Sequence, residues 1–256
     1  MSILSLLKSN SKPIISLLSV IVIWDIAVRI FKFPVFILPP PYDVIVAIFK
    51  FFNVISSNML TTLYETLTGY GLSIVLGLPL GILIVYSKFS KDYIMPLLVI
   101  TNSIPKSALA PLFLLWAGYG PMSKILISFL MAFFPIVLNT AVGLYRIDEN
   151  KINLVKCLNG TPLQIFMKVR LPNALPSIFA GLKLSITLAL IGAVVGEFVG
   201  GSRGIGVLIL SAATEIKTAI VFACIIVISI VGIILFYGVE LAQKIIIPWY
   251  KEHSQM

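Results

Sequence analysis

Residues that carry enzyme chemistry are few in this sequence and widely separated. The one histidine, His253, stands near the C-terminal end, Cys157 lies in a polar segment, and Cys224 lies in a late apolar run. Catalytic and metal sites need several such groups close together, and the sequence has no Ser/His/Asp or Cys/His set and no H-E-x-x-H motif. The phosphate-binding pattern G-x-x-x-x-G-K-[ST] is also missing. We therefore expect no catalytic residue, no metal ligands and no cofactor bound by this chain.

Ionisable residues inside apolar runs are the stronger functional candidates, because a charge is costly in hydrocarbon. Lys106 follows Pro105 in SIPKSALAP, where two prolines loosen a helix and free carbonyl groups. This lysine could face an aqueous path and attract an anion, or it could extend to the cytoplasmic interface. Glu197 precedes the glycine-rich segment GGSRGIG, where it could serve an outer gate or a subunit contact. Asp25 and Arg29 have helical spacing and most simply pair with each other.

A polar, basic segment, NLVKCLNGTPLQIFMKVRLP at 153–172, interrupts the apolar runs. Asp148 precedes it, and an acidic residue there can begin a short helix over about 149–158. The pair Asn159-Gly160 predicts a turn after that helix, because both residues tolerate positive φ.

A second short helix is predicted after this turn. Thr161 is suited to its cap and Pro162 to its first turn. Leu171-Pro172 is expected to end it, and its apolar stripe consists of Leu163, Phe166 and Val169. A helix–turn–helix with polar, basic flanks predicts a docking element for a soluble partner.

The composition identifies an integral membrane protein. Of the 256 residues, 59% are hydrophobic and 11% are charged, whereas soluble domains have about 25% charged residues. The net charge of +9 comes from single basic residues between apolar runs, which fits loops facing a cytoplasm and an anionic leaflet and excludes a nucleic-acid-binding stripe.

Six segments are long and apolar enough for helices that cross the bilayer, which takes about 20 residues. We expect the first to be a retained span, because it is long and lacks a small-residue cleavage site. More lysines and arginines fall on the side of the N-terminus, so both termini are predicted in the cytoplasm. The predicted spans are 13–31, 63–86, 94–117, 123–145, 176–199 and 218–247.

Two of these spans carry small residues at every fourth position, which allows helix backbones to approach closely in lipid. We expect these faces to pack against other helices, within one subunit or between two. They comprise Gly69, Ser73, Gly77 and Gly81 in the second span and Gly192 and Gly196 in the fifth. The segment 33–55 is too interrupted to span and is predicted as an interfacial helix on the outer face, with a re-entrant piece as the alternative.

The polar interruption resembles the cytoplasmic coupling loop, or EAA loop, of permease subunits in bacterial ABC importers. It has Asn153 where the family has the acidic residue, and Asn159 where the family has glycine. Segments such as TLYETLTGYGLSIVLGLPLGIL, FFPIVLNTAVGL and ALPSIFAGLKLSITLALIGAVVGEFVGGSRGIG are similar to the nitrate/sulfonate/taurine subgroup of these permeases. Relatives in that subgroup also import vitamin precursors and other small acids or heterocycles.

The resemblance implies a type I importer permease in the bacterial inner membrane, an all-α bundle of six transmembrane helices. It further implies a second permease copy, making a homodimer, together with two ATP-binding subunits that hold ATP and Mg and an extracytoplasmic solute-binding protein. Residues 1–60 would form the first span and outer segment, 61–247 a five-helix core and 248–256 a cytoplasmic tail. The coupling residues would be Asn153, Lys156, Asn159, Gly160, Thr161, Pro162, Phe166, Leu171 and Pro172.

Overall fold

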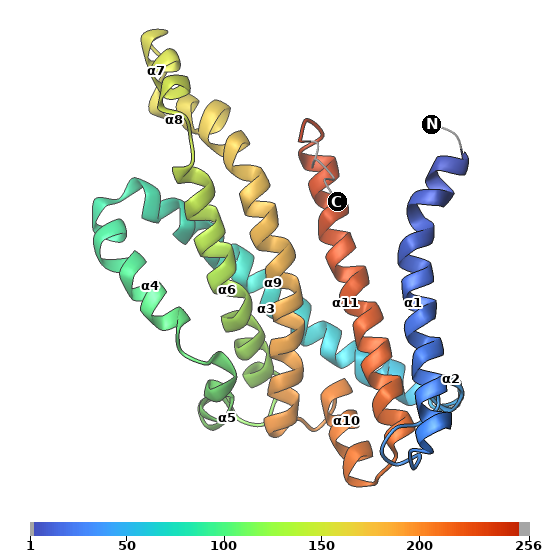
Figure 1. Cartoon of the computed structure of the whole chain (residues 1–256). Helices are drawn as coiled ribbons and strands as arrows, with labels where there is room; N and C mark the ends of the chain where they lie inside the picture. The colour runs from blue at the N-terminus through green and yellow to red at the C-terminus, as the bar shows by residue number, and fades with distance from the viewer. Residues whose placement is uncertain (1–2, 251–256) are drawn as a thin grey trace. The chain divides into compact units, whose positions relative to one another are not determined.

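All regular structure in the described residues is helical, as the sequence predicts (Figure 1). The computed structural model describes residues 3–250, with the side chains from 15 onwards except those of residues 17, 91 and 149. The helices are α1 (Ile3–Phe31), α2 (Pro41–Lys50), α3 (Phe52–Tyr86), α4 (Met95–Asn102), α5 (Ala110–Ala117), α6 (Pro121–Tyr145), α7 (Glu149–Cys157), α8 (Pro162–Ile165), α9 (Leu171–Gly200), α10 (Ile205–Thr214) and α11 (Thr218–Ile246).

Four helices in the described part of the chain are long and apolar enough to cross a membrane. They are α3, α6, the continuous helix Pro162–Gly200 and α11, and a bent pair of helices over Asp92–Ala117 makes a fifth candidate. The first predicted span, 13–31, lies in α1, where several side chains fall outside the described ones. The count of six therefore stays a prediction.

The predicted interfacial segment 33–55 contains α2 and the beginning of α3. Pro41 begins α2, because proline has no N–H to lose in a first turn and its φ is already helical. The chain turns at Phe51, and α3 then runs from Phe52 to Tyr86. The helix predicted for 63–86 thus begins eleven residues earlier than expected, since nothing in the polar stretch 56–58 breaks it.

The third predicted span, 94–117, is not one straight helix. Its two arms, α4 and α5, meet at an angle of 87°. Pro105 causes the break, because it lacks an N–H and disfavours helical geometry in the residue before it. Its own backbone is extended, with ψ 102, and a single turn of tighter 3-10 helix, Lys106–Leu109, leads into α5.

Contacts between residues group the chain into two compact units. The first contains residues 1–57 and 208–227. Within it the rings of Trp24 and Phe222 pack at 5.5 Å, and Thr218 Oγ1 donates a hydrogen bond of 2.7 Å to the carbonyl of Phe36. Asp25 and Arg29 form the ion pair that their spacing predicts, at 2.7 Å.

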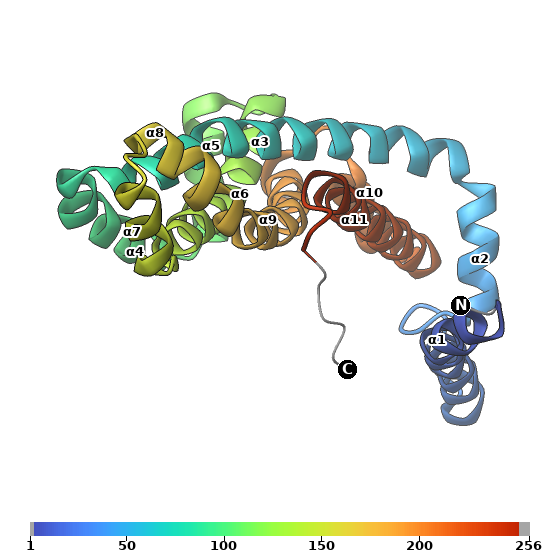
Figure 2. The ribbon, with the colours of Figure 1, turned by 90° about the horizontal axis from the view of Figure 1, so that it is seen from above.

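The second unit, 58–207 with the segment from 228, is built on α6 and α9, which run side by side (Figures 1 and 2). Their backbones approach closely at small residues: a Cβ on Gly192 would lie 2.8 Å from the Cα of Ser128. Ser185 Oγ donates to the carbonyl of Ala132 at 2.8 Å, a polar contact that suits helix pairing in lipid.

The small-residue face of α3 lies against α6. A Cβ on Gly69 or Gly81 would come within 2.8 Å of α6 atoms, and one on Gly77 within 3.1 Å. Between them Ser73 is fully buried, and its Oγ–H is shared between the carbonyl of Gly69 in α3, at 2.8 Å, and that of Phe129 in α6, at 2.9 Å. Close backbone approach and interhelical hydrogen bonds thus fix α3 on α6.

Candidate functional site

The predicted docking segment is an ordered helix–turn–helix at one end of the second unit (Figure 1). Asp148 caps α7, accepting a hydrogen bond from the backbone N–H of Asn150 at 2.9 Å. Several large apolar side chains of this segment are exposed, although its two helices are joined by a well-formed turn. Exposed apolar side chains on an ordered segment are typical of a surface that another protein covers. These exposed residues are Leu154, Leu158, Leu163 and Met167.

The turn between α7 and α8 differs in one respect from the prediction. Only Asn159 has positive φ, at 56, and Gly160 does not. Gly160 is instead needed for space: its N–H donates to the carbonyl of Val155 at 2.9 Å, and a Cβ there would overlap the Val155 side chain. The reason for glycine at this position is close approach, not backbone conformation.

Helix α8 begins with the cap and first-turn proline that Thr161 and Pro162 predict, and Gln164, which was not predicted to take part, completes a capping box. The backbone N–H of Thr161 donates to Gln164 Oε1 at 2.8 Å, and the Gln164 N–H donates to Thr161 Oγ1 at 3.3 Å. Each residue satisfies a donor of the other, so the start of α8 is fixed without help from a partner.

The predicted end of this helix at Leu171-Pro172 is wrong. The chain stays helical from Pro162 to Gly200, so α8 runs directly into the span α9. A wider π-helical turn, Phe166–Arg170, precedes the proline, and Leu171 N–H bonds back to the carbonyl of Phe166. Widening of the turn at this point accommodates a ring that would clash in a regular α-helix.

The docking segment is attached to the C-terminal end of α3 by aromatic contacts. Phe166, half-buried, packs edge-on against Tyr86 with ring centroids 5.7 Å apart. The guanidinium of Arg170 lies 5.3 Å from the same tyrosine ring. Movement of α8 would therefore reach both α3 and α9.

The remaining predicted coupling residues divide by exposure. Asn153, Lys156, Asn159, Thr161 and Pro162 are exposed, and Gly160, Leu171 and Pro172 are half-buried. The apolar stripe predicted from the sequence did not include three apolar residues that are exposed in the structure. These are Leu154, Leu158 and Met167, and their positions on either side of the turn could have been read from the sequence.

Lys106 lies at the break between α4 and α5. Its Nζ donates to Asn102 Oδ1 at 2.7 Å and lies 4.7 Å from the centre of the Phe134 ring. The ammonium group is therefore held beside the break, half-buried, while neighbouring Pro105 is exposed.

Glu197, the predicted gate residue, is buried at the end of the second unit remote from α7. Thr62 Oγ1 donates to its Oε1 and the Gly206 N–H to its Oε2, each at 2.6 Å. Glu65 and Lys124 are buried beside it. The helical spacing of Thr62 and Glu65, which are both buried, was the signal in the sequence for a buried polar face.

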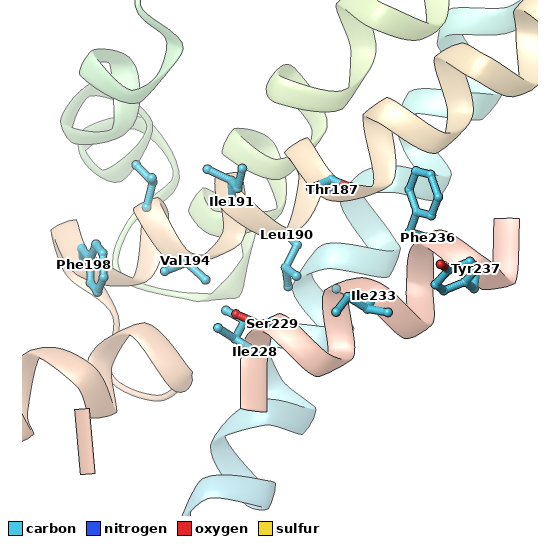
Figure 3. A pocket seen from close by; sticks show the side chains of 12 residues that line it. Thr187, Leu190, Ile191, Val194, Phe198, Ile228, Ser229, Ile233, Phe236 and Tyr237 are labelled. Atoms are coloured by element: carbon cyan, nitrogen blue, oxygen red, sulfur yellow. The ribbon is translucent and has the colours of Figure 1, made fainter. Parts of the chain in front are cut away.

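A groove of about 620 Å³ lies between α9 and the second unit's part of α11. Figure 3 shows side chains such as Leu190 of α9 and Ile233 of α11 facing this space. Its lining is mostly apolar, and its polar groups are the hydroxyls of Thr187, Ser229 and Tyr237. Such a lining is better suited to contact with lipid hydrocarbon than to binding a charged solute.

Among the side chains that the structure describes, no three His, Cys, Asp or Glu gather where they could hold a metal ion. Cys157 is exposed and Cys224 is buried, and both are free thiols.

Known proteins with similar sequences and folds include transport permeases. The formylaminopyrimidine transport permease protein ThiX of Halalkalibacterium halodurans is 35% identical over 94% of this chain and 96% of its own length. The taurine transport system permease protein TauC of Escherichia coli is 27% identical over 90% of this chain and 86% of its own.

A structure of the MetNI methionine ABC transporter in an inward-facing conformation shares the fold, with a TM-score of 0.66 and 18% identity. The match covers 76% of this chain and 97% of the transporter chain. Residues 73–251 match the family described as binding-protein-dependent transport system inner membrane component. This chain therefore belongs to that family, the permease subunits of ABC importers.

Proposed function

We propose that this permease subunit lines the path of a small anionic or heterocyclic solute and couples it to a separate ATPase through α7 and α8. The observation that carries the coupling is the capped turn with exposed Leu154, Leu158, Leu163 and Met167. This segment is continuous with a membrane-crossing helix, so a force applied at α8 would be transmitted along α9.

The solute class follows from the relatives and from the charge near the break. One relative is named for formylaminopyrimidine and another for taurine, which are a heterocycle and a sulfonate. Lys106 supplies a cation at the broken span, and the apolar groove between α9 and α11 suits lipid. We place the solute path along the broken span and not in that groove.

The partners follow the same proposal. Two copies of this chain form the pore, two ATPase subunits hold ATP and Mg beneath it, and a solute-binding protein docks on the outer face. Both termini lie in the cytoplasm, so that α7 and α8 face the ATPase. ATP and the loaded binding protein would then favour different conformations of one two-state bundle.

Affinity purification of the tagged protein from mild detergent tests the coupling. We expect a P-loop ATPase to co-purify in stoichiometric amount and to be lost when residues 153–170 are scrambled. A protein that is free of ATPase and still moves solute in liposomes would instead indicate an autonomous carrier.

Replacing Lys106 with leucine tests the path. The initial rate of ATP-driven taurine uptake should fall about tenfold, because one charge-assisted contact contributes about 1.5 kcal/mol. Lys183→Leu is the matched control, because Lys183 is also half-buried and lies 5.9 Å from the centre of an aromatic ring, that of Phe236. It should leave the rate within about twofold, since Phe236 lines the groove that lies off the proposed path. Equal rates for Lys106→Leu and the unaltered protein would remove Lys106 from the path.

A further inference from the structure

The end of the second unit remote from α7 encloses a cluster of buried ionisable side chains that coupling does not explain. Glu65 of α3, Lys124 of α6 and Glu197 of α9 are each at most 2% exposed. Two ionised carboxylates and one ammonium group would leave a net negative charge in a buried site, which is costly. The protonation of the two acids therefore decides whether the cluster is balanced.

Hydrogen bonding identifies Glu197 as the ionised member. Its Oε2 accepts from the Gly206 N–H and its Oε1 from Thr62 Oγ1, both at 2.6 Å. Thr62 Oγ1 itself accepts from the Ile205 N–H at 2.8 Å, and its other acceptor, the Asn58 carbonyl, is farther away at 3.2 Å. A donor on each oxygen is the pattern of a carboxylate, which has no proton to give.

Glu65 has the opposite surroundings. Its carboxyl group lies within hydrogen-bonding reach of Glu197, and its Oε2 is buried with no partner among the described residues. Two carboxyl groups can bond to each other only through a proton. Because both Glu197 oxygens already accept, that proton belongs to Glu65, whose unpaired oxygen is then a neutral carbonyl and costs less to bury than a charged one.

Nearby positive charges offset the negative charge of Glu197. Lys124 Nζ donates to the carbonyls of Tyr119, Gly120 and Gly200 at 2.7, 2.9 and 3.0 Å, which uses all three of its donors. Its single charge offsets one carboxylate. Arg203, exposed, lines with Glu65 and Lys124 a shallow cavity of about 470 Å³ at the cluster's edge.

We infer that Glu65 is a proton-binding site, a neutral acid that donates to ionised Glu197 and so fastens the turn 201–206 onto α3. Three backbone N–H groups attach this turn. Gly206 donates to Glu197, Ile205 donates to Thr62 of α3, and Gly204 donates to Asn58 Oδ1 of α3 at 2.9 Å. Removal of the proton would place two like charges in contact beneath this turn and weaken its attachment. This proton is a property of the folded subunit and does not depend on the solute or on the ATPase.

Infrared spectroscopy of the purified protein tests for the proton. At neutral pH we expect a carbonyl-stretching band of a protonated carboxyl group that shifts in heavy water. The band should be lost in Glu65→Gln. It should be kept in the control Glu215→Gln, which alters an exposed glutamate that directly follows α10 and pairs with Lys217. A missing band in the unaltered protein, or an unchanged band in Glu65→Gln, would overturn the inference.

Hydrogen exchange of the peptide containing 201–206 tests the fastening, because glutamine can still donate to Glu197 but cannot lose a proton. At neutral pH the unaltered protein and Glu65→Gln should exchange alike. At alkaline pH the unaltered protein should exchange faster than Glu65→Gln measured at the same pH. Equal exchange at both pH values would show that the proton does not hold the turn.

Discussion

Replacing Gly160 with valine should abolish co-purification of the ATPase and reduce ATP-driven uptake about tenfold or more. A Cβ at this position would overlap the side chain of Val155 and lie 2.8 Å from its carbonyl oxygen. That oxygen accepts the Gly160 N–H, so the two residues cannot separate without losing the bond that closes the turn. Overpacking of this kind costs about 1–3 kcal/mol, enough to displace α7 from α8.

The control for this variant is Gly120→Val. Gly120 is also a loop glycine at the start of a helix, but a Cβ there meets nothing within 4 Å. Both variants should insert into the membrane in similar amounts, and only Gly160→Val should lose the ATPase. ATPase retained in full by Gly160→Val would mean that docking does not depend on the geometry of this turn.

Coupling in this proposal rests on the continuity of α8 with α9. A short helix ending at Leu171-Pro172 would be a hinged attachment, whereas the observed helix runs unbroken from Pro162 to Gly200. The contacts of Phe166 and Arg170 with Tyr86 add α3 to the same moving part. A displacement at the docking surface would thus act on two membrane-crossing helices at once.

Local signals in the sequence predicted local structure well. The cap at Thr161, the positive φ at Asn159 and the pairing of Asp25 with Arg29 each depend on residues within four positions of one another. Apolar length predicted the helical class and most spans in the same way.

Features that depend on distant residues were not predictable. Glu65, Lys124 and Glu197 meet because three helices bring them together, and nothing near any of them in sequence indicates the other two. Pro105 and Pro172 show that the effect of a proline cannot be predicted from its identity alone. Pro105 bends its span by 87°. The other is accommodated by a π-helical turn inside a continuous helix.

Replacing Gly69 with valine should destabilise the second unit more than any other change on the small-residue face of α3. A Cβ at Gly69 would lie 2.6 Å from Ser128 Oγ and 2.8 Å from the carbonyl oxygen of Ile125. The serine hydroxyl can rotate away, but the backbone of α6 cannot move without disturbing its packing against α9. At a cost of about 1–3 kcal/mol, the midpoint of thermal unfolding should fall by about 5 °C.

Gly71→Val provides a matched control, because Gly71 lies two residues further along the same helix and a Cβ there meets nothing within 4 Å. The two variants share the change in side chain and helix propensity and differ only in the surface they present. Unfolding followed by circular dichroism in detergent should show a large fall for Gly69→Val and a small change for Gly71→Val. Equal falls in the unfolding midpoint would mean that helix propensity, and not contact with α6, explains glycine in this span. A fall confined to Gly69→Val would assign the loss of stability to the close packing of α3 on α6.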